Sequence, residues 1–309
     1  MSEHTNTTKR RSAIQIMGSL IGLVKPLLHI MLAAIILGTL GYLCAIFLTI
    51  LAGQVIMHGL LTGIAGMIVP VEKMWLVFTP VKTIIIVMIV IAVLRGILHY
   101  VEQYCNHFIA FKLLAIIRHK VFASLRKLCP AKLEGRDKGN LISIITTDIE
   151  LLEVFYAHTI SPIAIATLTS VIMVIFIGRY HWLAGLLALA AYLIVGVAIP
   201  MWNGKRGSQK GMEFRTSFGE LNSFVLDSLR GLDETIQYGQ GEKRKEQMTG
   251  QSKNLAGMQE SLSKMEGSQR SFTNMVILLA SFGMLALTIW LYDKGAMGFE
   301  GILTCTIAM

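Results

Sequence analysis

The sequence predicts an all-α membrane protein, and three observations support this fold class. Hydrophobic residues make up 54% of the 309 residues and charged residues only 15%, whereas about a quarter of the residues in a soluble domain are charged. Five apolar runs are long enough to cross a bilayer, which takes ~20 residues of helix. The alternation of apolar and polar residues that is typical of strands is missing from the sequence.

The crossings follow one another along the chain. The first run is free of charged residues over residues 26–71, and its length distinguishes it from a signal peptide, whose apolar region has about 7–15 residues. A sixth apolar run is too short to span, so we expect the chain to stop within a sixth helix. The remaining runs cover residues 81–107, 153–179, 179–205, 271–292 and, for the short sixth run, 301–309.

The second span continues far beyond the membrane. Residues 81–128 contain no proline and a single glycine, Gly96, so they can form one unbroken helix. At ~1.5 Å per residue this helix is roughly 70 Å long, while the hydrocarbon core is ~30 Å thick. Its first half is apolar and its second half is basic, so the second half is expected to project into water.

The charges indicate how the chain is oriented. Residues 112–138 hold eight basic residues against two acidic ones, and residues 205–270 hold eleven against nine. Basic loops stay in the cytoplasm, so we expect a multi-pass protein of the cell membrane with its N-terminus inside. Residues 1–25 are then a cytoplasmic tail and residues 26–309 one transmembrane domain. The net charge of +9 thus reflects orientation and gives no reason to expect nucleic acid as a partner.

Two long cytoplasmic hairpins link the spans. Pro130 breaks the first, and the second carries an apolar stripe that includes Phe214, Phe218, Leu229 and Leu232. We expect turning regions at residues 126–130, 211–219 and 239–241. The hairpins are either surface features without a partner or docking elements for a soluble domain outside this chain. An apolar tip favours docking, because it can bind in a groove on a partner. Six residues are expected to contact that domain: Arg126, Lys127, Leu128, Pro130, Phe214 and Phe218.

Two segments resemble the transmembrane domain of type 1 ABC exporters. Residues 138–153, which begin Lys-Gly-Asn-Leu-Ile-Ser, are similar to the pattern that follows the first intracellular hairpin of that family, although Asn140 and Ile144 depart from it. Residues 226–239 are similar to the segment after the second hairpin, with Asp227 in place of glutamate. The resemblance implies six spans and two long hairpins. It also implies ATP with Mg bound by a nucleotide-binding domain absent from this chain, a second half-transporter as partner, and surrounding lipids.

A narrower resemblance lies on the second span. Tyr100, Glu102 and His107 match the Arg-Tyr-x-Glu-Arg-x-x-x-His run of the thiol-reductant exporter subunits of cytochrome bd assembly, with His99 and Gln103 in place of the arginines. The resemblance implies a heterodimer that exports cysteine or glutathione, with haem at His107. A lone histidine is more often a structural hydrogen-bonding residue. Three further histidines have no expected ligand partner nearby: His29, His58 and His158.

Four polar residues of the second span share one helical face. Arg95, His99, Glu102 and Asn106 recur at spacings of four, three and four. A charge facing lipid costs roughly 2.5–3.5 kcal/mol, so this face is expected to line a substrate path that meets the carboxylate or amine of a solute. Alternatively, two of the four, Arg95 and Glu102, neutralise each other. Their neighbours Val93 and Ile97 are expected on the packed side.

Catalytic and metal-binding motifs are absent from the sequence. There is no Gly-x-x-x-x-Gly-Lys-Ser/Thr loop, no His-Glu-x-x-His and no Cys-x-x-Cys pair among the four cysteines. We therefore predict no catalytic residue and no metal site, and ATP hydrolysis requires a nucleotide-binding domain. Export of a lipid, peptide or drug remains open, as does a membrane scaffold that transports nothing.

Overall fold

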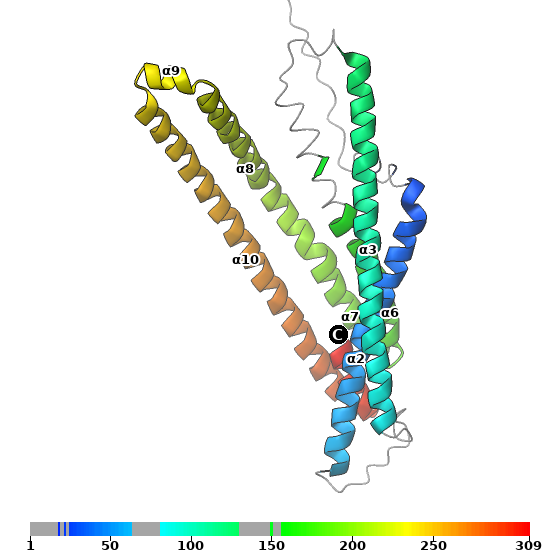
Figure 1. The fold of residues 1–309 in the computed structure, drawn as a ribbon. Coiled ribbons are helices and arrows are strands. Elements are labelled where there is room, and N and C mark those ends of the chain that lie inside the picture. Colours follow the sequence, from blue (N-terminus) through cyan, green and yellow to red (C-terminus); the bar gives the residue numbers. More distant parts are fainter. Residues whose placement is uncertain (1–17, 19–21, 23–24, 64–80, 130–148, 151–155) are drawn as a thin grey trace, which may run out of the picture. The chain divides into compact units, whose positions relative to one another are not determined.

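The computed structural model describes residues 25–63, 81–129, 149–150 and 156–309, with isolated positions 18 and 22 (Figure 1). Every regular element within these residues is helical, which confirms the predicted all-α class. The chain forms two compact units, one up to Ile175 and the other from Phe176 to Ile307, and each is described by itself.

The first unit is built on two long helices. α2 covers Leu28–Gly63 and α3 covers Val81–Leu128, so the predicted unbroken helix is confirmed. Lipid offers backbone groups no hydrogen-bonding partner, which favours long helices that satisfy their own N–H and C=O groups. α2 packs against α3 around Leu27, Ile109 and Leu113, and the short turn Lys25–Leu27 leads into α2.

The second unit contains α7 to α11, and α6 begins in the first unit and runs across the boundary. Its turns have clear local causes: the His181 Nδ1 accepts a hydrogen bond from the Leu183 N–H at 3.2 Å and caps α7, while Gly239 and Gly295 take positive φ values of 63° and 69° after helix ends. The helix bounds are α6 Ser161–Gly178, α7 Trp182–Leu193, α8 Ile199–Arg230, α9 Leu232–Gln237, α10 Gly241–Asp293 and α11 Phe299–Ala308.

Two of the spans contain a π-helical turn, and a proline follows each turn. The turn Tyr156–Ile160 precedes Pro162, and the turn Ile194–Ala198 precedes Pro200. A proline in a helix removes one N–H and clashes with the carbonyl four residues earlier. That carbonyl belongs to the central residue of each turn, so the wider π turn accommodates the proline without ending the span.

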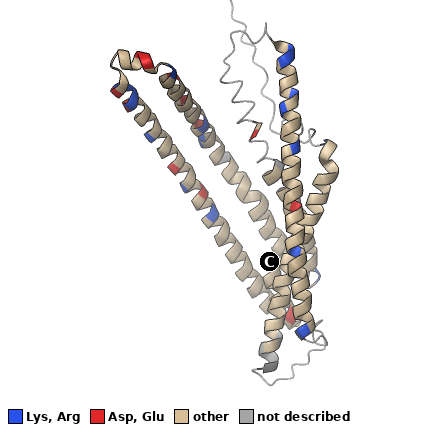
Figure 2. Ribbon diagram, viewed as in Figure 1, with Lys and Arg blue, Asp and Glu red and all other residues tan. Residues whose placement is uncertain are grey.

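Five described helices are long and apolar enough to cross a membrane, which confirms the five predicted crossings. Figure 2 shows basic residues along the C-terminal half of α3, and charges of both signs on the parts of α8 and α10 next to α9. The spans are Lys25–Met57, Lys82–Leu128, Ala157–Gly178, Trp182–Gly204 and a part of Gly241–Asp293.

The hairpin of α8 and α10 turns later in the chain than the prediction of a turn at residues 211–219 placed it. α8 continues without a break to Arg230, so the turning region predicted at residues 211–219 is wrong. Gly211 and Gly219 have no positive φ, and the helix absorbs each glycine at a cost of about 1 kcal/mol. The turn predicted at residues 239–241 is confirmed next to α9 (Figure 1). Pro130 lies outside the described residues.

Polar and cation–π contacts hold α8 against α10. The Arg244 guanidinium lies 4.8 Å from the centre of the Phe224 ring, and the Lys210 Nζ donates to the Ser261 Oγ at 3.1 Å. The predicted apolar stripe is only partly buried in this arrangement. Six apolar side chains of the hairpin, here called the apolar tip set, remain 48–73% exposed: Phe218, Leu226, Leu229, Leu232, Ile236 and Tyr238.

Three helices of the first unit meet at Gly38. A Cβ atom on this α2 residue would clash with the Ile165 side chain of α6 and come within 3.0 Å of the Glu102 Cγ of α3. Both neighbours are buried, with exposed fractions of 3%. The missing side chain of Gly38 therefore lets α2, α3 and α6 approach closely, as small residues do between membrane helices.

We expect the substitution Gly38→Ala to lower the stability of the protein. The added methyl group has no space, and overpacking of this kind costs about 1–3 kcal/mol. Thermal unfolding in detergent measures the effect, with Gly41→Ala as the matched control because its Cβ would lie 3.7 Å from the nearest atom. Equal unfolding midpoints for the two variants would contradict this packing.

Candidate functional site

The four polar residues of the stripe on α3 differ strongly in burial. Glu102 and Asn106 are 3% and 2% exposed, whereas Arg95 and His99 are exposed. The burial follows from the packing of α3, because Glu102 lies where α2 and α6 approach it at Gly38. The stripe thus runs from a solvent-exposed end at Arg95 to a buried end at Asn106.

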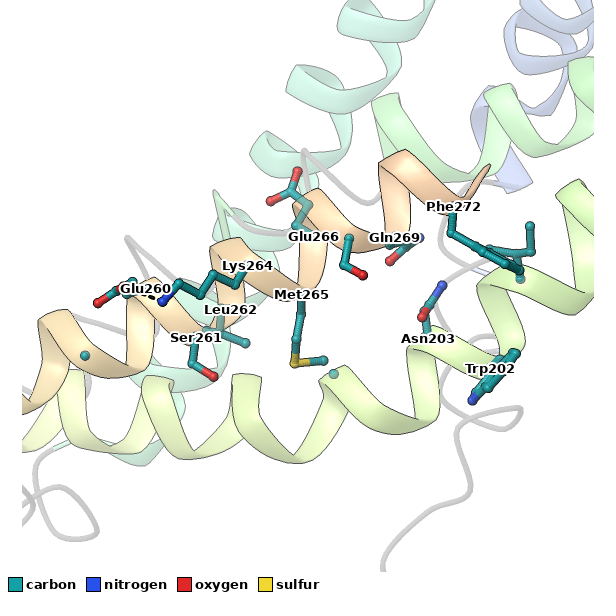
Figure 3. A pocket seen from close by; sticks show the side chains of 14 residues that line it. Trp202, Asn203, Glu260, Ser261, Leu262, Lys264, Met265, Glu266, Gln269 and Phe272 are labelled. Carbon is teal, nitrogen blue, oxygen red and sulfur yellow. Dashed lines mark ion pairs between the residues drawn. The ribbon is translucent and has the colours of Figure 1, made fainter. Parts of the chain in front are cut away.

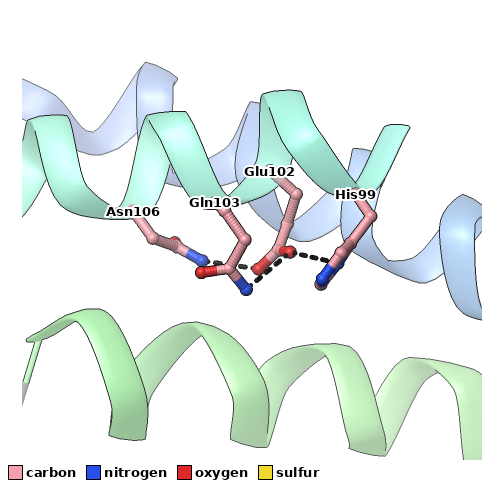
Figure 4. Close-up of polar contacts among 4 residues, drawn as sticks. All are labelled: His99, Glu102, Gln103 and Asn106. Atoms are coloured by element: carbon pink, nitrogen blue, oxygen red, sulfur yellow. Dashed lines mark hydrogen bonds and ion pairs between the residues drawn. The ribbon is translucent and has the colours of Figure 1, made fainter. Parts of the chain in front are cut away.

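The Glu102 carboxylate is the centre of a hydrogen-bonded cluster (Figure 4). Its Oε1 accepts a hydrogen bond of 2.6 Å from the Asn106 Nδ2. Its Oε2 accepts one of 3.1 Å from the Gln103 Nε2 and lies 3.2 Å from the His99 Nδ1. These donors stabilise a carboxylate that would otherwise be costly to bury. We refer to His99, Glu102, Gln103 and Asn106 as the Glu102 cluster.

Arg95 is not the partner of this carboxylate. Within the described part of the chain no ion pair joins Arg95 to Glu102, so the alternative in which these two residues neutralise each other is not supported. Arg95 instead lines a cleft of about 190 Å³ between α2 and α3, together with residues of both helices. The other lining residues are Gly38, Gly41, Tyr42, Ala45 and His99.

Within the first unit, the apolar neighbours of the stripe are not the residues that pack, and their protection in the assembled transporter stays a prediction. Val93 and Ile97 are 59% and 56% exposed in the first unit, while Glu102 is buried. Helical periodicity identifies which residues share a face, but it does not say which face meets the neighbouring helix. A span that is apolar nearly all round gives no amphipathic signal to settle that choice.

Two members of the site lie outside the predicted stripe. Gln103, which stands in place of an arginine of the family pattern, donates to Glu102. Gly38 lies with Gly41 in a charge-free span, where small residues signal a close helix contact. Those two glycines are the sequence signal that identifies the partner of the stripe.

His107 lies beyond the buried end of the stripe and has an aromatic environment. Its ring stacks on Phe111 with centres 6.1 Å apart and meets His158 edge to face at 5.9 Å. The sequence did not predict this ring contact of His158 with His107, and the contact does not test whether either histidine is a ligand. These contacts account for the position of His107 without a bound group, so haem binding by His107 stays a prediction.

The residues predicted to contact a soluble domain lie at two places. Arg126, Lys127 and Leu128 form the exposed C-terminal end of α3, where basic side chains also complement the helix dipole. Phe214 and Phe218 stack on each other within α8, with ring centres 6.2 Å apart. Arg118 lies in α3 before this C-terminal end, and its Nη2 pairs with the Glu150 Oε1 at 3.2 Å.

A second and larger cleft separates α8 from α10 (Figure 3). It encloses about 750 Å³, with Trp202 and Phe272 towards one end and the Glu260–Lys264 ion pair of 2.7 Å on α10. The charges of that pair compensate each other at the surface, where they contribute little to stability. This cleft lacks the buried carboxylate that distinguishes the stripe on α3.

Comparison with known proteins identifies the family to which this helical architecture belongs. The family model of the ABC transporter transmembrane region matches residues 27–309. The chain belongs to this family. The resemblance noted for residues 138–153 and 226–239 is thereby confirmed for the transmembrane region of an ABC transporter.

Several relatives carry descriptive names. A probable ABC transporter ATP-binding/permease protein of Haemophilus influenzae is 38% identical over 97% of this ABC transporter chain and 52% of its own length. The glutathione/L-cysteine transport protein CydC of the same species is 22% identical over 71% of the chain and 37% of its own length. An ATP-dependent lipid A-core flippase of Shewanella denitrificans is 23% identical over 47% of the chain and 24% of its own length. The chain thus spans about half the length of the first relative, and less of the others.

We expect cysteine reactivity to follow the burial of the stripe. In a background without native cysteines, His99→Cys reacts with a water-soluble maleimide about tenfold faster than Asn106→Cys, because modification requires exposure. Mass spectrometry of the labelled full-length protein gives both rates. Faster labelling at position 106 would contradict the geometry. The cysteines to be replaced are Cys44, Cys105, Cys129 and Cys305.

Proposed function

We propose that this chain is the transmembrane half of an ATP-driven exporter of a small thiol or amino-acid-like solute such as cysteine or glutathione. The observation that carries the proposal is the Glu102 cluster, a buried polar group on the same unbroken helix as the basic end at Arg126. A membrane helix keeps an ionisable residue in its interior mainly for function. In the cleft beside it, Arg95 and His99 can meet a charged group of a small zwitterion.

The proposed mechanism is alternating access. Closure of two nucleotide-binding domains on ATP and Mg moves the cytoplasmic helix ends, and the spans then expose the solute to the opposite side. The nucleotide-binding domains are supplied by the same polypeptide or by separate subunits. The relative from Haemophilus influenzae is named as both ATP-binding and permease and is about twice as long as this chain.

The proposed assembly contains a second half-transporter in the cell membrane, with the N-terminus of this chain in the cytoplasm. A single chain leaves large apolar side chains of α3 exposed, including Ile89, Val90 and Val93 at 58–59%. Lipid and a second half would cover these faces. We favour a heterodimer because the relatives named for glutathione/L-cysteine transport include two differently named proteins, CydD and CydC.

Lipid export is the second candidate, because lipid A-core flippases are among the relatives at similar identity. Their matches cover about half of this chain, whereas the match to the CydC protein covers 71%. The buried carboxylate also favours a polar solute, since an acyl chain gains nothing from unmet hydrogen-bonding groups.

Coupling to the motor domains is proposed at the end of α3 and along the hairpin of the second unit. Arg126, Lys127, Leu128, Phe214 and Phe218 keep this proposed role, and Pro130 completes the set from the sequence. To these we add the rest of the apolar tip set, because exposed apolar side chains in a water-facing hairpin suit a groove on a partner.

We expect Phe218→Cys and Ile236→Cys to form disulfide crosslinks with cysteines on a nucleotide-binding domain in the assembled transporter. ATP should change the crosslink yield, because closure of the motor domains moves the hairpin. The exposed α10 position Ser252 serves as control and should crosslink poorly after substitution by cysteine. Failure of both test positions to crosslink in an active transporter would reject the docking proposal.

We expect the full-length transporter with its partner to accumulate cysteine or glutathione inside liposomes in which it is inserted inside-out, and this accumulation should depend on ATP. Glu102→Ala should lower the rate about tenfold or more, which is the scale of one lost charge-assisted hydrogen bond. Radiolabelled uptake measures the rate, and Tyr104→Phe on the exposed side of α3 is the control. Stimulation of ATP hydrolysis by lipids but by no thiol would overturn the thiol assignment.

A further inference from the structure

Asn106 has a fixed orientation in the Glu102 cluster. A carboxylate oxygen accepts hydrogen bonds, so the amide group that lies 2.6 Å from the Glu102 Oε1 has to be the Asn106 Nδ2. The opposite orientation would place the Asn106 Oδ1 against another acceptor. The geometry therefore directs the Asn106 Oδ1 away from the carboxylate.

This oxygen lacks a partner although it is buried. Asn106 is 2% exposed, and among the described residues no donor reaches its Oδ1. Buried polar atoms are nearly always hydrogen-bonded in native proteins. An unsatisfied oxygen beside a carboxylate would be stabilised by a further hydrogen-bond donor.

The surroundings define which donor fits. The Glu102 carboxylate and the Asn106 Oδ1 are both acceptors, and among the described residues no Lys or Arg forms an ion pair with Glu102. The donors that do reach Glu102 are two neutral amides and the largely exposed His99. A group with a positive charge and several N–H donors would satisfy both acceptors, and charged hydrogen bonds are the stronger ones.

We propose that Glu102 and Asn106 bind the primary ammonium group of the transported solute. This assignment rests on the proposed function, because it treats the cleft between α2 and α3 as the place where the solute enters. Gly38 connects the two features: it lines that cleft, and its Cα position faces Glu102. An ammonium group provides three donors, enough for the Asn106 oxygen and for the carboxylate.

Equilibrium binding to the full-length transporter with its partner, without nucleotide, tests the assignment. The probes are radiolabelled cysteamine, which has an ammonium group and no carboxylate, and radiolabelled 3-mercaptopropionate, which has a carboxylate and no ammonium group. Glu102→Gln should weaken cysteamine binding about tenfold or more and change 3-mercaptopropionate binding less than about twofold. Asn106→Leu should show the same selective loss, and Tyr104→Phe should bind both probes as the wild type does.

Three results would overturn the assignment: an equal loss for both probes, no loss of cysteamine binding in either variant, or no binding of cysteamine by the wild type. Ethanolamine separates this inference from the proposed thiol export. Glu102-dependent binding of ethanolamine, together with no ATP-dependent accumulation of any thiol, retains the ammonium site and rejects the thiol substrate. Thiol accumulation that Glu102→Gln leaves unchanged retains the exporter and rejects the ammonium site.

Discussion

The lipid interior gives backbone N–H and C=O groups no partner, and the long α3 helix is the direct consequence of this constraint. Because Val81–Leu128 contains no proline, the helix continues unbroken over roughly 70 Å, more than twice the ~30 Å thickness of the hydrocarbon core. The same element thereby carries the Glu102 cluster and the basic end at Arg126. A displacement at one end of a continuous helix is transmitted to the other, as the proposed coupling requires.

The Glu102 cluster shows how a membrane protein can keep a carboxylate in its interior. Two amide groups and His99 supply donors to Glu102, and Gly38 lets the neighbouring helices close around it. Local donors can satisfy the carboxylate oxygens, but they leave the Asn106 oxygen without a partner. The cluster is therefore stable enough to fold and still incomplete, and this combination is typical of a binding site that a ligand completes.

The sequence predicted those features that depend on local composition and periodicity. The five spans, the unbroken α3 and the turn at Gly239 follow from apolar length, the absence of proline and the conformational freedom of glycine. The shared face of Arg95 and Glu102 follows from helical geometry alone. Contacts between helices that are distant in sequence could not be predicted in this way. Such contacts determine that Glu102 is buried against α2 and that Val93 is exposed. They also bring His107 next to His158.

We propose that the continuity of α3 links the Glu102 cluster to ATP hydrolysis, and a variant with an interrupted α3 is the sharpest test. Ala115 is exposed between Asn106 and Arg126, and Ala115→Pro would clash with the Phe111 carbonyl and kink the helix at a cost of about 3 kcal/mol. In the full-length transporter with its partner, solute-stimulated ATPase activity is measured beside solute binding, with Ala115→Ser as control. Ala115→Pro is expected to retain solute binding and to lose the stimulation of ATPase activity. Undiminished stimulation in this variant would show that the continuity of α3 is not needed for coupling.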